Sequence, residues 1–135
     1  QVETEMSRAY NDNERNARRY GRLYTWEAAK KACPPGWRLP SDEDWTELIE
    51  HLGGHESAAV FFARSGRRGF NAVMAGDYHP DHGFRRLGTH THYWSATPGP
   101  DGETVVTRSF YKSGTIVGRN TYNPNAGFSV RCIKE

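Results

Sequence analysis

Two cysteines, Cys33 and Cys132, are the feature that most limits how this chain can fold. A bond between them would close a loop of about 100 residues, and chain entropy would then add about 4.7 kcal/mol to the free energy of unfolding. A whole domain typically has about 5–15 kcal/mol. Spacing alone leaves a disulfide and two independent buried thiols open. A nucleophilic cysteine is disfavoured, because the chain has no Cys-x-x-Cys motif and no His/Asn pattern beside either cysteine.

Size and composition predict one small domain. The chain has 135 residues, 36% hydrophobic and 13% aromatic, and each aromatic ring buries about 150–250 Å² in a core. The net charge is only +2. The basic stretches at 15–19 and 64–68 are too short to follow a phosphate backbone, and no apolar run approaches the roughly 20 residues of a membrane span. We therefore expect no nucleic acid partner and no direct membrane insertion.

Two helices are predicted in the first half of the chain. The first covers residues 25–32, with Thr25 as N-cap, and ends at the Cys-Pro-Pro-Gly segment 33–36 because proline interrupts the helical hydrogen bonds. The second follows the Ser41/Asp44 capping box and ends at Gly53-Gly54. Its apolar residues recur at helical spacing and form one face: Trp45, Leu48, Ile49 and Leu52.

The rest of the chain predicts loops and short strands. Residues 1–20 are expected to form an irregular lead-in, residues 21–135 a single domain, and residues 54–92 a loop-rich region. Strands are expected at 93–97, 104–111, 115–119 and 127–133, with a hairpin turn at 112–114. The predicted class is α+β, two helices with short antiparallel strands. All four tryptophans are expected in the core: Trp26, Trp37, Trp45 and Trp94.

Several segments together resemble the Fibrobacter succinogenes major paralogous domain family. They run from Tyr20 to Ala29, from Cys33 to Asp42, from Tyr93 to Thr97, and from Gly127 to Ile133. The resemblance implies a C-type-lectin-like fold and an extracellular or cell-surface module of bacteria. It also implies a disulfide between the first helix and the last strand, which pairs Cys33 with Cys132.

The same resemblance extends to formylglycine-generating enzymes, which use cysteines and copper to oxidise a substrate thiol. With both cysteines in the implied disulfide, no thiol remains for that reaction, and no phosphate loop or Ser-His-Asp signature indicates another one. We expect a non-catalytic protein without a cofactor. The alternative is a metal-dependent or oxidative enzyme related to the formylglycine-generating proteins.

Histidines are concentrated in the middle of the chain, at His79, His82, His90 and His92. Imidazole and carboxylate at short spacing suit a divalent metal, so His79, Asp81 and His82 are the candidate ligands if one binds. A polar loop without metal is the favoured interpretation. The calcium-dependent sugar motifs of true lectins are absent, and Asn123-Pro-Asn125 matches them only in part.

Tyrosine, asparagine and arginine are concentrated near the C-terminus, a composition typical of antibody paratopes. The resemblance points to the same region, because lectin-like folds bind ligands there and some retroelement-diversified proteins vary there. We expect a recognition or adhesion module for a protein or glycan on another cell or surface; an ordinary solvated loop and a structural repeat unit without a ligand are the alternatives. The candidate contacts are Tyr111, Arg119, Asn120, Tyr122, Asn123, Asn125, His90 and His92.

Overall fold

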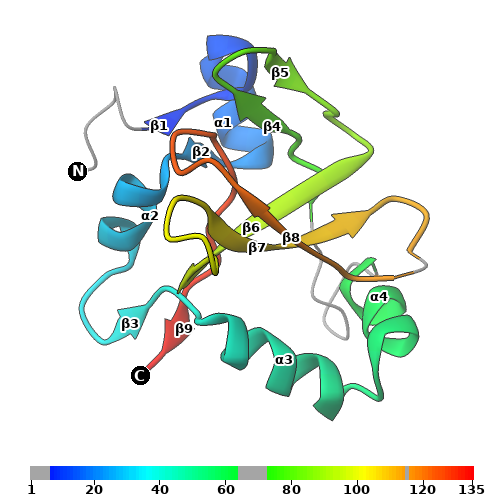
Figure 1. Ribbon diagram of the computed structural model, residues 1–135. Coiled ribbons are helices and arrows are strands. Elements are labelled where there is room, and N and C mark those ends of the chain that lie inside the picture. The colour runs from blue at the N-terminus through cyan, green and yellow to red at the C-terminus, as the bar shows by residue number, and fades with distance from the viewer. Residues whose placement is uncertain (1–6, 64–72, 115) are drawn as a thin grey trace.

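A three-stranded antiparallel sheet forms the centre of the protein (Figure 1). The computed structural model describes residues 7–63, 73–114 and 116–135. The sheet has the order β6 (His90–Pro98), β7 (Val105–Tyr111) and β8 (Gly118–Tyr122). Three two-stranded antiparallel sheets and four α-helices complete the described part of the chain. The predicted α+β class is confirmed.

Each face of the central sheet packs against its own hydrophobic cluster. Tyr93 and Phe110 face α3 (Asp42–His51) and α4 (His55–Ala63), where Trp45 and Phe62 join them. Trp94 and its neighbours on the other face pack against residues of α2 (Trp26–Ala32) and of the C-terminal segment; this second cluster contains Ala29, Leu39, Trp94, Val105, Ala126 and Phe128. The change of face between Tyr93 and Trp94 is the ordinary alternation of a strand.

The two helices predicted from the sequence are present. In α2 the Thr25 hydroxyl accepts a hydrogen bond from the Ala28 amide at 3.3 Å. In α3 both halves of the capping box form: the Ser41 hydroxyl accepts from the Asp44 amide, and the Asp44 carboxylate accepts from the Ser41 amide. Sequence patterns that satisfy free backbone amides therefore placed both starts correctly.

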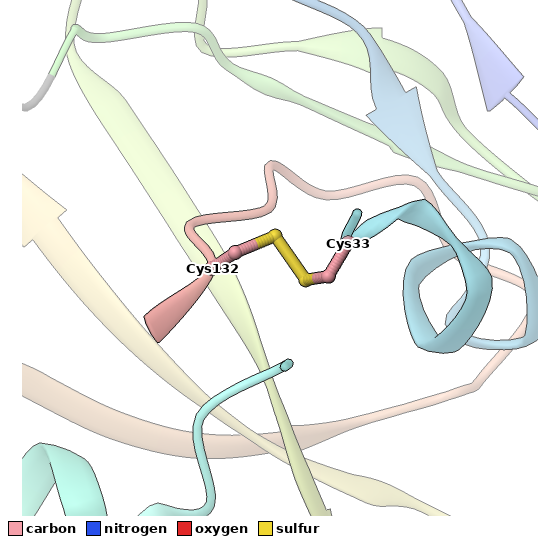
Figure 2. The surroundings of a disulfide bond; sticks show 2 residues. All are labelled: Cys33 and Cys132. Atoms are coloured by element: carbon pink, nitrogen blue, oxygen red, sulfur yellow. A yellow bond between two sulfur atoms is a disulfide. The ribbon is translucent and has the colours of Figure 1, made fainter. Parts of the chain in front are cut away.

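The predicted disulfide is confirmed (Figure 2). Cys33 lies at the C-terminal end of α2, and Cys132 lies directly before β9 (Ile133–Lys134). Their Cα atoms are 5.8 Å apart across a sequence separation of 99 residues. β9 also pairs with β3 (Trp37–Arg38), so backbone hydrogen bonds and a covalent bond hold the same two segments together.

The expectation of two helices and a loop-rich region at 54–92 was wrong for the residues that the structure describes; the part at 64–72 lies outside them. Residues 55–63 form α4, and residues 77–85 contain the hairpin of β4 (Asp77–His79) and β5 (Gly83–Arg85). α4 is apolar around most of its circumference, so it shows no alternation between apolar and polar faces that periodicity could detect. His90 to His92, also placed in that loop, belong to β6.

Residues 1–20 were expected to be irregular, but residues 7–20, the part of this segment that the structure describes, are ordered. β1 (Ser7–Arg8) pairs with β2 (Leu23–Tyr24), and between them lie η2 (Tyr10–Asp12) and α1 (Glu14–Tyr20). The Asn13 side chain caps α1 by accepting from the Arg15 amide at 3.0 Å. Because Ala9 and Tyr10 are buried, this segment is part of the packed body.

Two expectations about the last third also need correction. The strand predicted at 127–133 is reduced to β9, because the residues before it form isolated bridges to different partners, including Tyr24↔Phe128 and Tyr93↔Ser129. The strand predicted at 115–119 is β8, which begins at Gly118; residue 115 lies outside the described residues. Trp37 is not a core residue: it is 44% exposed on β3, a strand of a small surface sheet.

Candidate ligand-binding site

Strand register brings five of the predicted contact residues onto one face of the central sheet, and four of them are open to solvent. Directly paired residues of an antiparallel sheet share a face. His90 pairs with Tyr111, Asn120 with Thr107, and Tyr122 with Val105. Ser109, which lies between Thr107 and Tyr111 on the same face, pairs with His92. We call His90, Tyr111, Asn120 and Tyr122 the sheet platform; all four side chains are exposed or half-buried.

His90 and Tyr111 form one end of the platform. Their rings meet edge to face, with centroids 5.0 Å apart and planes at 90°. A Cβ atom at Gly118 would lie 2.6 Å from the Tyr111 hydroxyl, so the phenol can lie across β8 only because this position is glycine. Partial burial and the positive charge of Arg86 lower the pKa of His90, which keeps its imidazole neutral at physiological pH.

Asn120 and Tyr122 form the other end. The Asn120 amide nitrogen donates to the Ser109 hydroxyl at 3.3 Å, and Asn120 is exposed. The Tyr122 ring rests on Phe128, with centroids 4.9 Å apart. Tyr122 is thus a rigid aromatic surface, and Asn120 offers both a donor and an acceptor beside it.

His92, predicted to contact a ligand, lies on the same face as the platform but is only 1% exposed. The imidazole Nδ1 and the Ser109 hydroxyl are hydrogen-bonded at 2.6 Å, and Nε2 lies 3.4 Å from a carboxylate oxygen of Asp77. His92 and His90 share a face, but His92 lies farther along β6, between Phe128 and Tyr122. The His92 ring therefore packs against the platform residue Tyr122 and is covered from solvent.

Asp77 anchors this buried group from β4. Burial opposes ionisation of the carboxyl, but His92 and the Arg86 guanidinium, 2.8 Å away, outweigh it and hold the pKa of Asp77 below its ordinary value. Nε2 of His92 has no hydrogen-bond partner among the described residues, so its contact with Asp77 is electrostatic. This contact links β4 to β6, and hydrogen bonds through Ser109 link β6, β7 and β8.

Asn123 and Asn125 follow the platform in an exposed turn after β8. The Asn123 side-chain oxygen accepts from the Asn125 amide at 2.8 Å, an arrangement that shapes the turn. The Pro124 carbonyl in turn accepts from the Trp26 amide at 2.9 Å. This turn follows the platform residue Tyr122 directly. The side-chain oxygen of Asn123 is already engaged in the hydrogen bond within the turn.

Arg119 lies on the opposite face, where it pairs with Arg108. Its Nε donates to Asp42 at 2.8 Å, and the Arg108 Nε donates to the other oxygen of the same carboxylate. The structure therefore separates Arg119 from the other predicted contacts.

The metal candidates lie at the turn between β4 and β5. The His79 and His82 rings are 4.8 Å apart, and His79 Nδ1 accepts from the Asp81 amide. In the residues that the structure describes, no group of three or more histidine, cysteine, aspartate or glutamate side chains is arranged to hold a metal ion.

Sequence reasoning missed Ser109, Asp42 and Arg108. Thr107 and Ser109 alternate along β7, as His90 and His92 do along β6. That period of two was a usable signal for one polar face, but only the register shows that the two pairs meet. Nothing local in the sequence indicated the two arginine partners of Asp42.

The match to known families is to the Fibrobacter succinogenes major domain, over residues 1–134. The chain belongs to this family. A search of curated proteins found no match, and neither did a search of solved structures.

This member of the Fibrobacter succinogenes major domain family has two cysteines, and they are bonded to each other. Structural disulfides persist in oxidising compartments, so the bond indicates a location outside the cytoplasm. None of the described helices has the length and apolar character needed to cross a membrane.

Proposed function

We propose that this protein is a non-catalytic recognition module with a C-type-lectin-like fold, secreted or displayed on a bacterial cell surface, which binds a protein or glycan through the sheet platform. The observation that carries the proposal is the platform itself. Its aromatic rings and an amide are held on a fixed sheet, beside buried polar residues that contact one another. Residues of this kind provide contact area and adaptable hydrogen bonds at low entropic cost.

The chemistry of the buried residues supports a binding role over a catalytic one. His92 contacts Ser109 through one ring nitrogen and Asp77 through the other. Ser109 is fully buried, however, so its hydroxyl is not available to a substrate. The oxidative alternative requires a thiol, and both cysteines are in the disulfide. The surface site at the platform requires neither a nucleophile nor a cofactor.

The test is a screen of glycan and cell-surface protein arrays, followed by affinity measurements with variants. Tyr111→Ala and Asn120→Ala should each weaken binding of any hit by about tenfold or more, as expected for central contact residues. The matched control is Tyr20→Ala, because Tyr20 is a half-buried tyrosine on α1 and outside the platform. Equal affinity of the wild type and the Tyr111→Ala/Asn120→Ala double variant would refute this location of the site.

The proposal includes diversification of the ligand-binding surface by a retroelement. This predicts that close relatives differ mainly within residues 93–130, at platform positions and in the adjoining turn. Sequencing related loci checks this expectation. Substitutions spread evenly over the chain would contradict it.

A further inference from the structure

A pocket lies on the face of the central sheet opposite the platform, between β7, β8 and the helices α3 and α4. It has a volume of about 360 Å³. Its lining combines two arginines from the strands with residues of the helices: Thr46, Ile49, Glu50, Gly54, His55, Arg108 and Arg119. It shares no residue with the platform.

Arg108 of β7, Arg119 of β8 and Asp42 of α3 form a charge triad at one wall of the pocket. Asp42 accepts from Nε of Arg108 and from Nε of Arg119, each at 2.8 Å, and a terminal nitrogen of Arg108 donates to the Thr46 hydroxyl at 2.7 Å. One carboxylate neutralises only one guanidinium, so the triad keeps a net charge of +1. Because Arg108 is 3% exposed, part of this charge lies where water screens it poorly.

Donors remain for a ligand. Within the part of the chain that the structure describes, the two terminal nitrogens of Arg119 have no protein acceptor, and one terminal nitrogen of Arg108 has none either. Arg119 is 53% exposed, so its free edge is reachable from solvent. A guanidinium presents two parallel N–H groups that match a carboxylate.

The start of α4 adds a further favourable feature. The Gly54 carbonyl accepts from the Ala58 amide at 2.9 Å, which makes Gly54 the N-cap residue of this nine-residue helix. Glycine has no side chain to accept from the first free amides, and a helix N-terminus favours negative charge. Glu50 opposes these groups, but it is exposed and lies on α3.

We propose that this pocket binds the carboxylate group of a small acidic ligand, which pairs with the free edge of Arg119 beside the Arg108–Asp42–Arg119 triad. The inference does not depend on the proposed function, because it concerns other residues on the other face.

The experiment is an amide NMR titration of the full chain with sodium glucuronate, compared with glucose at the same ionic strength. Glucuronate should shift the amides of Gly54, His55 and Arg119, and glucose should not. Arg119→Gln should lower the affinity about tenfold, since a charge-assisted hydrogen bond is lost. Glu50→Gln should raise it about two- to threefold, because a repelling charge is removed.

Lys134→Gln is the control, since Lys134 is an exposed cation on β9 and outside the pocket. Equal shifts with glucose and glucuronate, or unchanged affinity in Arg119→Gln, would overturn the proposal. A third titration uses N-acetylglutamate. Matching shifts would support recognition of the carboxylate alone, and shifts with glucuronate only would support an acidic sugar. Tyr111→Ala should change none of these results, so failure here leaves the platform proposal standing.

Discussion

The imidazole Nδ1 of His92 lies 2.6 Å from the Ser109 hydroxyl oxygen, in the buried part of the sheet face that carries the platform. Nε2 of the same ring faces the Asp77 carboxylate at 3.4 Å, which favours a proton on Nε2. Nδ1 then accepts from Ser109, and Ser109 accepts from Asn120. A buried carboxylate is thereby connected to an amide on the surface through two side chains.

Replacing His92 should destabilise the protein strongly. His92→Phe removes one of the groups that pair with the buried Asp77 carboxylate, so we expect the free energy of unfolding to fall by about 2–4 kcal/mol. Ser109→Ala should cost about 1–2 kcal/mol because Nδ1 loses its donor. Urea unfolding followed by circular dichroism measures both. His82→Ala, an exposed histidine on the β4–β5 turn, should change stability by less than about 0.5 kcal/mol. An equal effect of His92→Phe and His82→Ala would contradict the pairing.

Gly76→Ala should be far more damaging than Gly83→Ala. Both glycines have positive φ, +70° and +78°, so alanine is strained at each by about 1–2 kcal/mol. A Cβ atom at Gly76 would also lie 2.6 Å from the Arg85 carbonyl oxygen and 2.7 Å from the Tyr10 ring, whereas Gly83 faces open space. We expect at least about 2 kcal/mol of additional destabilisation at Gly76. Thermal unfolding of the two variants measures the difference; similar melting temperatures would show that the close packing tolerates a methyl group.

Local chemistry made α2 and α3 predictable, since a capping residue, a first-turn acid and a following proline or glycine act within a few residues. It could not reveal α4, because an almost wholly apolar helix gives no amphipathic period. The candidate site divided in the same way. Residue type identified Tyr111, Asn120 and Tyr122, but the face on which each lies depends on strand register. Register placed Arg119 on the other face. His92 is buried because Tyr122 and Phe128, which come from distant parts of the chain, pack against its ring, and no local pattern contains that information.

Stability should fall in acid through Asp44. The Arg38 guanidinium and the hydrogen bonds from Ser41 outweigh partial burial and lower the pKa of Asp44 to about 2. A carboxyl with a depressed pKa in the folded state contributes stability above its unfolded pKa of about 3.9, and this contribution is lost as the pH falls towards 2. Asp44→Asn should therefore show a flatter stability curve than the wild type between about pH 4 and 2.

Urea unfolding at closely spaced pH values provides the measurement for Asp44. Glu47→Gln is the control because Glu47 is an exposed carboxylate on the same helix. Parallel curves for Asp44→Asn and the wild type would show that Asp44 does not carry this acid sensitivity.

Removing the disulfide should lower the free energy of unfolding by about 2–5 kcal/mol, because the bond restricts a long loop in the unfolded chain. The variant is Cys33→Ser/Cys132→Ser, compared with the wild type by urea unfolding. Dithiothreitol should destabilise the wild type to the same level and leave the variant unchanged. A variant as stable as the wild type would mean that the pairing of β3 with β9 and the two hydrophobic clusters hold these segments together without the disulfide.

The position of the Cys33–Cys132 bond also decides what a protease can do to this protein. Every platform residue and every residue that lines the pocket beside Arg108 and Arg119 lies between the two cysteines. A single cut anywhere in that interval leaves two fragments that remain covalently joined. A nicked molecule in a protease-rich environment can therefore keep all its recognition residues together, and its damage becomes visible only when the sample is reduced.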